Sequence, residues 1–295
     1  MSQNTLRCGV IGVGRMGRHH ARVYAQMPDA ELIGVVDRDL GRANDIVEEW
    51  GGAAWDSIDE IIKAGVDAVT IATPTTHHRE AAEQLLEAGV ACLIEKPLAP
   101  NADDAAAIAE AAERAGVALQ VGHVVRYDPV MQAIKSLGEI HPRHLELHRI
   151  SPMTFRSVDV GVVLDMMIHD LDLLTMLVGM APDSVAASSV AVLGEAEDVC
   201  NVRMTYTLDE AGRECVANLT ASRLAMKTER TLRIISEDMY VSADFVNRKV
   251  KVVRKSSNAD QISELRDRLA SGEDLSSLNY LDVIDFEDLE VDDRE

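Results

Sequence analysis

A glycine-rich run near the start of the chain constrains its fold more than any other feature. Residues 6–11 form a short apolar run that predicts a buried strand, and residues 18–27 have the length and composition of a helix. Between them, Gly12, Gly14 and Gly17 form the pattern G-x-G-x-x-G. At this spacing the first glycine permits a tight turn, the second lets the backbone approach a pyrophosphate, and the third lets the helix pack on the strand. The run therefore predicts a strand–turn–helix unit that binds a dinucleotide.

An acidic residue ends the next strand, which we expect over residues 31–36. Asp37 follows Gly17 by 20 residues, the position from which a carboxylate binds the ribose 2′-OH of a dinucleotide. Because a carboxylate repels a 2′-phosphate, NAD is favoured over NADP. Arg38, next to Asp37, keeps NADP as an alternative cofactor. Its other interpretation is a solvated arginine that lies on the adenine. The N-terminus of the helix offers N–H groups and a positive dipole end to the phosphates. The residues expected at the dinucleotide from this unit are Gly12, Val13, Gly14, Arg15, Met16, Gly17, Asp37 and Arg38.

The alternation of predicted strands and helices changes near residue 122. Up to that point single helices separate strands such as residues 67–72, 90–94 and 117–121, which indicates a parallel sheet with right-handed crossovers. From residue 182 onwards, alternating runs such as residues 199–208 predict an antiparallel sheet covered on one face. The fold class is therefore α/β. We expect an N-terminal Rossmann domain with a doubly wound parallel sheet, residues 1–122, and a C-terminal α+β domain with a large, mostly antiparallel open sheet, residues 123–295.

Composition excludes several classes of function. The 295-residue chain has a formal net charge of −21, which disfavours nucleic acid and anionic membranes as partners. Aromatic residues make up 3% of the chain, too few for surfaces on which bases stack. No apolar stretch reaches the length of a membrane span, and the polar N-terminus does not resemble a signal peptide. The four cysteines lack C-x-x-C spacing, so we expect reduced core residues in a cytoplasmic protein.

A turn with two histidines follows the strand at residues 67–72. Ligands of open α/β sheets bind outside the carboxyl ends of the strands, so Thr73 and Pro74 are expected along the dinucleotide. Thr76 is expected to cap the next helix, residues 76–88, with His77 in its first turn. Since no third ligand stands at a sensible spacing, His77 and His78 are interpreted as an ordinary surface pair rather than a metal site.

The tripeptide Glu95-Lys96-Pro97 follows the strand at residues 90–94. A lone lysine after a strand is usually solvated. Here Pro97 restricts Lys96 to extended geometry and can take a cis bond that aims the side chain. The position also faces the crevice in which a dinucleotide would lie. We therefore expect Glu95 and Lys96 to contact the cofactor, and Lys96 to take part in the chemistry.

A third group of candidate residues lies on the helix expected over residues 162–178. Asp165 and His169 are four residues apart and so share one helical face. A carboxylate beside an imidazole orients it and raises its affinity for a proton, as a general base for alcohol oxidation requires. Asp172 shares the edge of that face. An isolated D-x-x-x-H is more typical of a helix start with a satisfied histidine, but the dinucleotide motif favours catalysis. The apolar face is expected to consist of Leu164, Ile168 and Leu171.

Taken together, these motifs resemble the glucose–fructose oxidoreductase / inositol dehydrogenase / MocA (Gfo/Idh/MocA) family. The resemblance implies an NAD(P)-dependent oxidoreductase that acts on a hydroxyl of a sugar or cyclitol, served by Lys96, Asp165 and His169. Residues 151–157 and 163–172 look most like a branch that oxidises the 3-OH of UDP-N-acetylglucosamine. Many relatives have a glycine triplet where residues 159–163 read D-V-G-V-V, so a different substrate pocket is expected. The matching stretches are G-V-I-G-V-G-R-M-G at 9–17, A-T-P-T-T-H at 72–77, E-K-P at 95–97, G-H-V-V-R-Y-D-P at 122–129 and L-D-M-M-I-H-D-L-D at 164–172.

The distal part of a nucleotide-sugar substrate needs cationic partners. Arg126, Tyr127 and Arg156 are candidates, because arginine grips a diphosphate in a forked geometry; ordinary surface ion pairs are an equally good interpretation. Two alternative functions remain open: a non-catalytic regulator that binds NAD and a sugar, and an epimerase or glycosidase that recycles tightly held NAD. Regulators of this fold tend to lose the catalytic lysine, so the presence of Lys96 argues against the first.

The expected open sheet also predicts self-association. The helices that precede the strands of residues 199–253 can cover only one face of the sheet. On the other face we expect Val216, Thr220, Thr231 and Ile235, a set too apolar and β-branched to lie in water as one patch. A homodimer or homotetramer that packs this face against its copy would bury it.

Overall fold

The computed structural model describes residues 5–154, 160–193, 195–279 and 283–292. The chain divides into two compact units, Met1–His123 and Val124–Glu295, which are described separately.

The N-terminal unit is built on a six-stranded sheet in the order β3-β2-β1-β4-β5-β6. Every pair of neighbouring strands is parallel, so the prediction of a doubly wound Rossmann sheet is confirmed. The strands are β1 (Leu6–Ile11), β2 (Ala30–Val36), β3 (Ala53–Trp55), β4 (Ala68–Ile71), β5 (Ala91–Ile94) and β6 (Leu119–Val121). The helices are α1 (Arg15–Gln26), α2 (Leu40–Trp50), α3 (Ile58–Lys63), the 3₁₀ turn η1 (Thr75–His77), α4 (His78–Glu87) and α5 (Ala102–Ala115).

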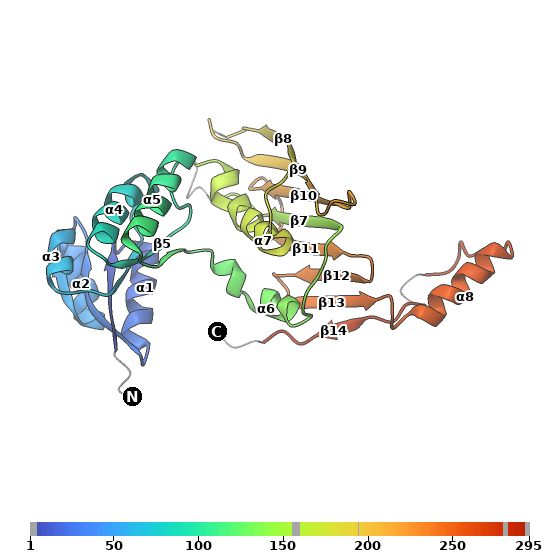
Figure 1. Cartoon of the computed structure of the whole chain (residues 1–295), viewed down its shortest axis with the longest axis horizontal. Coiled ribbons are helices and arrows are strands. Elements are labelled where there is room, and N and C mark those ends of the chain that lie inside the picture. Colours follow the sequence, from blue (N-terminus) through green and yellow to red (C-terminus); the bar gives the residue numbers. More distant parts are fainter. Residues whose placement is uncertain (1–4, 155–159, 194, 280–282, 293–295) are drawn as a thin grey trace. The chain divides into compact units, whose positions relative to one another are not determined.

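Helices cover both faces of this sheet (Figure 1). On one face, Ala21 of α1 and Ala43 of α2 pack with Val10 and Val35 of the sheet. On the other face, α3, α4 and α5 pack against a larger apolar cluster that includes Ile71. Because both faces are covered, the central strands are buried along nearly their whole length. The carboxyl ends of these strands are left at one edge of the sheet, where their turns are accessible.

Helices α2 and α3 and strand β3 have no counterpart among the predicted elements, although the capping residues of both helices can be seen in the sequence. Asp39 accepts a hydrogen bond from the backbone N–H of Arg42 at the start of α2. Ser57 caps α3 in the same way, accepting from Asp59. Side chains of this kind satisfy backbone N–H groups that have no partner within the helix.

The helix expected over residues 76–88 starts differently. It is preceded by η1, in which the N–H of His77 donates to the carbonyl of Pro74 at 2.9 Å. Neither η1 nor α4 has a side-chain cap, so the prediction that Thr76 caps this helix is wrong. The tighter 3₁₀ turn satisfies the N–H groups that the Thr76 hydroxyl was expected to bind.

The C-terminal unit is built on an eight-stranded sheet in the order β14-β13-β12-β11-β7-β10-β9-β8. All neighbours are antiparallel except β7 and β10, which confirms the mostly antiparallel sheet. The strands are β7 (His144–Ile150), β8 (Ser184–Val190), β9 (Val199–Thr207), β10 (Glu214–Ser222), β11 (Glu229–Ile235), β12 (Met239–Asp244), β13 (Lys249–Arg254) and β14 (Glu287–Leu289). The helical elements are η2 (Val124–Tyr127), α6 (Pro129–Lys135), η3 (Val163–Met167), α7 (Ile168–Val178) and α8 (Ala259–Ala270).

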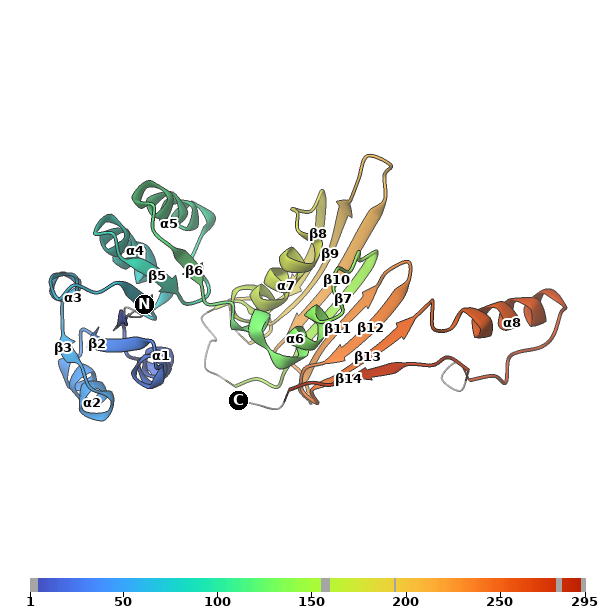
Figure 2. The same cartoon turned by 60° about the horizontal axis from the view of Figure 1, so that its bottom comes forward.

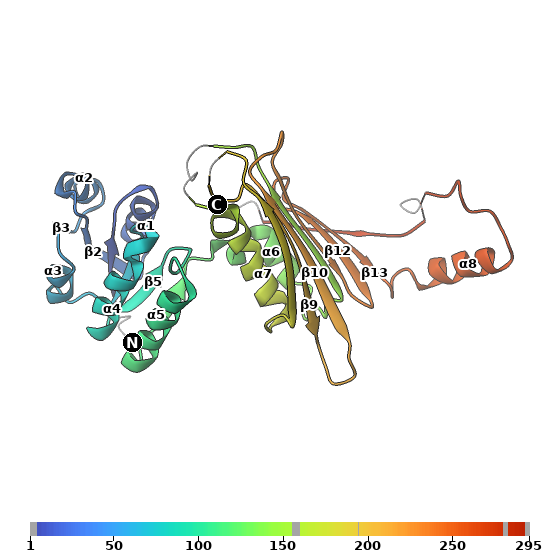
Figure 3. The same cartoon turned by 90° about the horizontal axis from the view of Figure 1, so that it is seen from above.

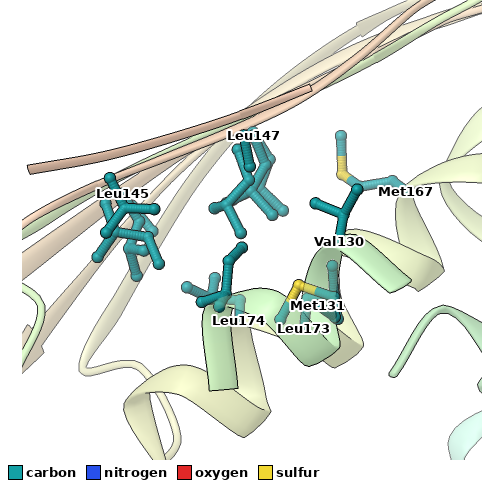
Figure 4. Close-up of a cluster of buried hydrophobic side chains, with 14 of the residues drawn as sticks. Val130, Met131, Leu145, Leu147, Met167, Leu173 and Leu174 are labelled. Atoms are coloured by element: carbon teal, nitrogen blue, oxygen red, sulfur yellow. The ribbon is translucent and has the colours of Figure 1, made fainter. Parts of the chain in front are cut away.

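Helices α6 and α7 lie on one face of this sheet (Figures 2 and 3). Figure 4 shows Met131 and Leu174 from these helices facing Leu145 and Leu147 of β7. The alternation of buried and more exposed residues along β7, β9 and β10 places every second side chain in this core. Burying one such Leu or Met contributes about 1.5–3 kcal/mol, so this helix-covered face holds the unit together.

The opposite face is more polar than the sequence analysis expected. A row of polar side chains crosses four adjacent strands, because Arg203, Asn218, Glu146 and Arg233 are register partners. Arg203 donates to Asn218 and Arg233 to Glu146, each at 3.1 Å. Apolar and β-branched residues flank this row, so the face is a mixture of polar and apolar residues. The residues expected there are nevertheless present at alternating register positions: Val216, Thr220, Thr231 and Ile235.

All four cysteines are buried as free thiols. Burial raises the pKa of Cys92 to about 12 and is the main cause that raises that of Cys215 to about 11, so both stay neutral and unreactive near neutral pH. In the part of the chain that the structure describes, no helix is both long and apolar enough to cross a bilayer.

Candidate functional site

The three glycines of the first turn have separate structural roles. Gly12 has a φ of 83°, a left-handed conformation that strains any residue with a Cβ atom. A Cβ added to Gly17 would lie 1.9 Å from the carbonyl oxygen of Gly12, so only glycine lets α1 approach this turn. A Cβ added to Gly14 would meet nothing within 4 Å. Gly14 is also the N-cap of α1 and gives no side-chain cap, which leaves the helix N-terminus open to an anion.

Asp37 is fixed at the end of β2 by backbone groups. Its Oδ2 accepts from the N–H of Val13 at 2.9 Å, and its Oδ1 accepts from the N–H of Asp39 at 2.9 Å. A guanidinium nitrogen of Arg42 lies 3.4 Å from both oxygens. Each carboxylate oxygen has two lone pairs, so a ligand hydroxyl would take the place of a 3.4 Å contact of Arg42, the longer of the two contacts at each oxygen. Arg42 stands half-exposed beside this carboxylate, and the sequence analysis missed it.

A cavity of about 660 Å³ joins these elements. Nine of the residues predicted at the dinucleotide line it: Gly12, Gly14, Arg15, Met16, Asp37, Arg38, Thr73, Pro74 and His77. Helices and loops that the sequence analysis did not place there contribute Asp39, Arg42, Asp56, Ile58, Glu80 and Gln84. Within the described residues, the buried hydroxyl of Thr73 has no hydrogen-bond partner, which suits a site that binds a polar ligand. The cavity, the uncapped helix and the fixed Asp37 fit a dinucleotide.

Other predicted cofactor residues do not line this cavity. Val13 is buried and holds Asp37, and Gly17 packs against the turn. Thr76 is exposed on η1. Glu95 and Lys96 belong to the turn after β5. Their expected contact with the cofactor therefore remains a proposal.

Glu95 anchors the backbone beside Lys96. It is buried, its Oε1 lies 2.8 Å from Nε2 of His20, and its Oε2 accepts from the N–H of Lys96 at 3.3 Å. Burial acts to raise the pKa of Glu95, but the interactions with His20 and Lys96 outweigh it, so the pKa is lowered. The Lys96–Pro97 bond is cis, the isomer that the sequence analysis allowed. Glu95 is thus an anionic support that fixes where the half-buried Lys96 side chain starts.

His78 is not an ordinary surface residue, contrary to the sequence analysis. It is 1% exposed, and its ring bonds to backbone on both sides. Its neighbour His77 is half-buried and lines the cavity.

The predicted helix that carries Asp165 and His169 begins with a π turn. In η3 the N–H of Ile168 donates to the carbonyl of Val163, five residues back. Single π turns within α-helices occur frequently at functional sites. Asp165 lies in this π turn and His169 in the first turn of α7, so the turn between them is wider than the regular α-helical turn expected from the sequence. The pairing of the two side chains remains a proposal.

The segment before this π turn is held by three polar residues. The N–H of Val163 donates to Oε1 of Glu197 at 3.1 Å. Arg223 donates to the carbonyl of Val160 at 2.7 Å and to Asp198 at 2.7 Å. A Cβ added to Gly161 would lie 2.0 Å from Oε1 of Glu197. Residues 160–163 thus form a fixed entry to the turn that carries Asp165.

Acidic residues, not only apolar ones, make up the buried side of α7. The expected apolar face is wrong at Leu164, which is exposed; Asp170 and Asp172 are buried with Leu173 and Leu174. Helix α7 tolerates these acids because each pairs with an arginine.

Arg126 makes a forked pair with Asp172, with distances of 2.7 and 2.5 Å. This is the ion-pair interpretation that the sequence analysis left open for Arg126, and it raises the pKa of the guanidinium. The Asp172 side chain is buried in this pair. Tyr127 is exposed, and the centroid of its ring lies 5.7 Å from the Lys135 ammonium. Arg156 lies outside the described residues.

Arg149 of β7 pairs with Asp170 next to His169. Both side chains are buried, and two guanidinium nitrogens lie 3.0 and 2.6 Å from Oδ1 of Asp170. Burial raises the pKa of Asp170, although Arg149 opposes this shift. The pair ties the first turn of α7 to the central sheet.

Comparison with known protein families finds a match within each of the two units. Residues 6–123 match the model of the Gfo/Idh/MocA oxidoreductase family with an NAD-binding Rossmann fold, and residues 135–241 match the C-terminal domain of that family. The chain is 39% identical to UDP-N-acetylglucosamine 3-dehydrogenase of Acidithiobacillus ferrooxidans over 252 residues, covering 85% of this chain and 78% of the relative. It is 32% identical to scyllo-inositol 2-dehydrogenase (NAD(+)) of Bacillus subtilis over 62% of this chain and 57% of the relative.

Comparison with solved structures also finds similar proteins. One structure of the Acidithiobacillus ferrooxidans enzyme superposes with a TM-score of 0.83 at 35% identity, covering 98% of this chain and 84% of that chain. An NAD complex of an enzyme from gentamicin A biosynthesis superposes with a TM-score of 0.71 at 25% identity, covering 82% of this chain and 72% of that chain.

Proposed function

Because the chain belongs to the Gfo/Idh/MocA family of NAD-binding oxidoreductases, we propose that it oxidises a secondary hydroxyl of a nucleotide sugar, the 3-OH of UDP-N-acetylglucosamine or of a close analogue. The observation that carries the substrate class is the 39% identity, over 85% of this chain, to an enzyme with that name. Sugars and cyclitols without a nucleotide are the next class, represented by the inositol dehydrogenases.

The lining of the 660 Å³ cavity fits NAD, with the pyrophosphate at the start of α1 and the ribose at Asp37. NAD supplies an acceptor for the hydride of the carbinol carbon when it is bound. In the proposed mechanism Lys96 donates a hydrogen bond to the reacting oxygen and stabilises its developing charge. His169, oriented by Asp165, takes the hydroxyl proton. General base catalysis of this kind contributes about 10²–10⁴-fold.

The direct test is formation of reduced nicotinamide, followed by absorbance, when the protein is mixed with NAD and UDP-N-acetylglucosamine. We expect turnover with this sugar to exceed turnover with myo-inositol, and NAD to be used at least about tenfold better than NADP, a difference of about 1.4 kcal/mol, because Asp37 repels a 2′-phosphate. Bound NAD without net reduction would favour the epimerase or glycosidase. Binding of NAD and sugar without any reaction would favour the regulator.

We also propose that the protein is a homodimer or homotetramer assembled through the face of the eight-stranded sheet opposite α6 and α7. This face combines apolar Val216 and Ile235 with the polar row of Arg203, Asn218, Glu146 and Arg233. Arginines and a glutamate on one patch allow a two-fold axis to set opposite charges against each other.

Light scattering is expected to give a mass of at least two chains of 32.2 kDa. Val216→Glu, on this face beside His144 of β7, should shift the protein towards monomer, because it places a charge in the proposed interface. Val246→Glu, in the exposed turn between β12 and β13, is the matched control and should leave the mass unchanged. A monomeric wild type at micromolar concentration would contradict assembly through this sheet.

A further inference from the structure

His78 links two turns of the candidate site. Its Nε2 lies 2.9 Å from the carbonyl oxygen of Thr73, in the turn after β4. Its Nδ1 lies 3.1 Å from the carbonyl oxygen of Pro97 and 3.2 Å from that of Leu98, in the turn after β5. The ring is 1% exposed, so water does not offer an alternative partner to either nitrogen.

The hydrogen-bond partners determine how many protons this ring carries. Carbonyl oxygens only accept, whereas a neutral imidazole has one N–H donor and one nitrogen that accepts. In a neutral ring, one nitrogen lone pair would therefore point at a carbonyl oxygen about 3 Å away, and that nitrogen would remain buried without a partner. The imidazolium donates at both nitrogens and satisfies all three contacts.

We propose that His78 is a buried imidazolium that acts as a positioning residue for Lys96. Glu95, held by His20, fixes the N–H of Lys96 on one side. His78 fixes the carbonyl groups of Pro97 and Leu98 on the other side. The same ring holds Thr73, which lines the cofactor cavity. His78 thus sets the position of the Lys96 backbone relative to the turn that faces the cofactor.

The proton count is tested on the wild-type protein without substrate, by ¹⁵N–¹H spectra of histidine-labelled protein near neutral pH. We expect two slowly exchanging N–H correlations from one ring, one from each nitrogen, that disappear in His78→Gln. A ring at position 78 with a single N–H, or with rapidly exchanging protons, would overturn the imidazolium. This result does not depend on the proposed function.

The positioning role rests on the proposed function and is tested by kinetics with NAD and UDP-N-acetylglucosamine. A displacement of about 1 Å at a reacting group costs about 10²-fold, so His78→Phe should lower kcat by about that factor with KM for the sugar nearly unchanged. His78→Gln donates from only one nitrogen and cannot span both turns, so it should be intermediate. His141→Gln, an exposed histidine of the C-terminal unit, is the matched control and should behave as wild type.

The outcomes are distinguishable. If the wild type does not oxidise the sugar, the proposed function fails. NAD titration still tests whether His78 positions Thr73 in the cofactor cavity. His78→Phe should then weaken NAD binding, and an unchanged NAD affinity would contradict this role of His78. If the wild type is active and both His78 variants lose thermal stability but keep kcat, His78 is merely structural and the positioning role is refuted. Should His78→Phe fail to fold, His78→Gln and the wild-type spectra decide.

Discussion

Lys96→Met is expected to lower kcat for oxidation of UDP-N-acetylglucosamine by about 10²–10³-fold, the effect of removing one donor to a developing oxyanion. NAD affinity should stay within a few-fold, because the pyrophosphate is expected at the backbone of the glycine turn and the ribose at Asp37. Methionine keeps much of the length and the apolar stem of lysine but cannot donate a hydrogen bond. Steady-state kinetics and titration with NAD measure the two effects separately.

Lys63→Met, at the exposed end of α3, is the control for the loss of one lysine charge. Activity of Lys96→Met within a few-fold of wild type would remove Lys96 from the chemistry. A large loss of NAD affinity would instead make Lys96 mainly a cofactor-binding residue.

Arg149→Met should destabilise the protein by about 3–5 kcal/mol near neutral pH, the typical cost of breaking a buried ion pair from one side. The variant leaves the Asp170 carboxylate buried without its cation. Burial already raises the pKa of Asp170, and loss of Arg149 should raise it further. When the pKa of a carboxyl group is higher in the folded than in the unfolded state, the free energy of unfolding falls as pH rises. The loss of stability relative to wild type should therefore be smaller at about pH 5 than at about pH 8.

Denaturant unfolding at the two pH values checks this expectation. Replacing the carboxylate as well, in Arg149→Met/Asp170→Asn, should restore part of the stability because no buried charge remains. Arg143→Met is the control: the partner of Arg143, Glu237, is exposed, and such a pair contributes about 0–1 kcal/mol. An equal loss in both single variants, without pH dependence, would contradict a special role for the buried pair.

The sequence predicts best where a signal is local. Apolar runs place β1, β2, β4, β5 and β9 to within about two residues, because a buried strand needs a continuous or alternating apolar pattern. Residues 53–63 show the limit: β3 has three residues and α3 has six, too few for a periodic pattern.

The candidate site divides in the same way. Gly12, Gly14 and Asp37 can be predicted because their roles follow from a short motif with fixed spacing. Arg42 and Gln84 reach the cavity only because α2 and α4 return along the sheet, which local sequence does not reveal. A search for helices that follow a strand ending in an acid would have found Arg42.

Long-range partners account for the remaining differences. The buried positions of His78 and Asp170 depend on carbonyl groups and an arginine 19–21 residues away. Without those partners a histidine pair and an acid at a helix start look like surface residues. The π turn that carries Asp165 likewise depends on a distant partner. The carboxylate of Glu197, 34 residues further along the chain, accepts a hydrogen bond from the N–H of Val163.

Hydride transfer from the sugar is the central claim, and an isotope label tests it most directly. UDP-N-acetylglucosamine with deuterium at carbon 3 is mixed with the protein and NAD, and the nicotinamide product is isolated for mass spectrometry and NMR. We predict one deuterium per reduced nicotinamide, at carbon 4, together with a 3-keto sugar nucleotide. Reduced nicotinamide without deuterium, or a sugar that keeps its label through turnover, would contradict oxidation at the 3-OH.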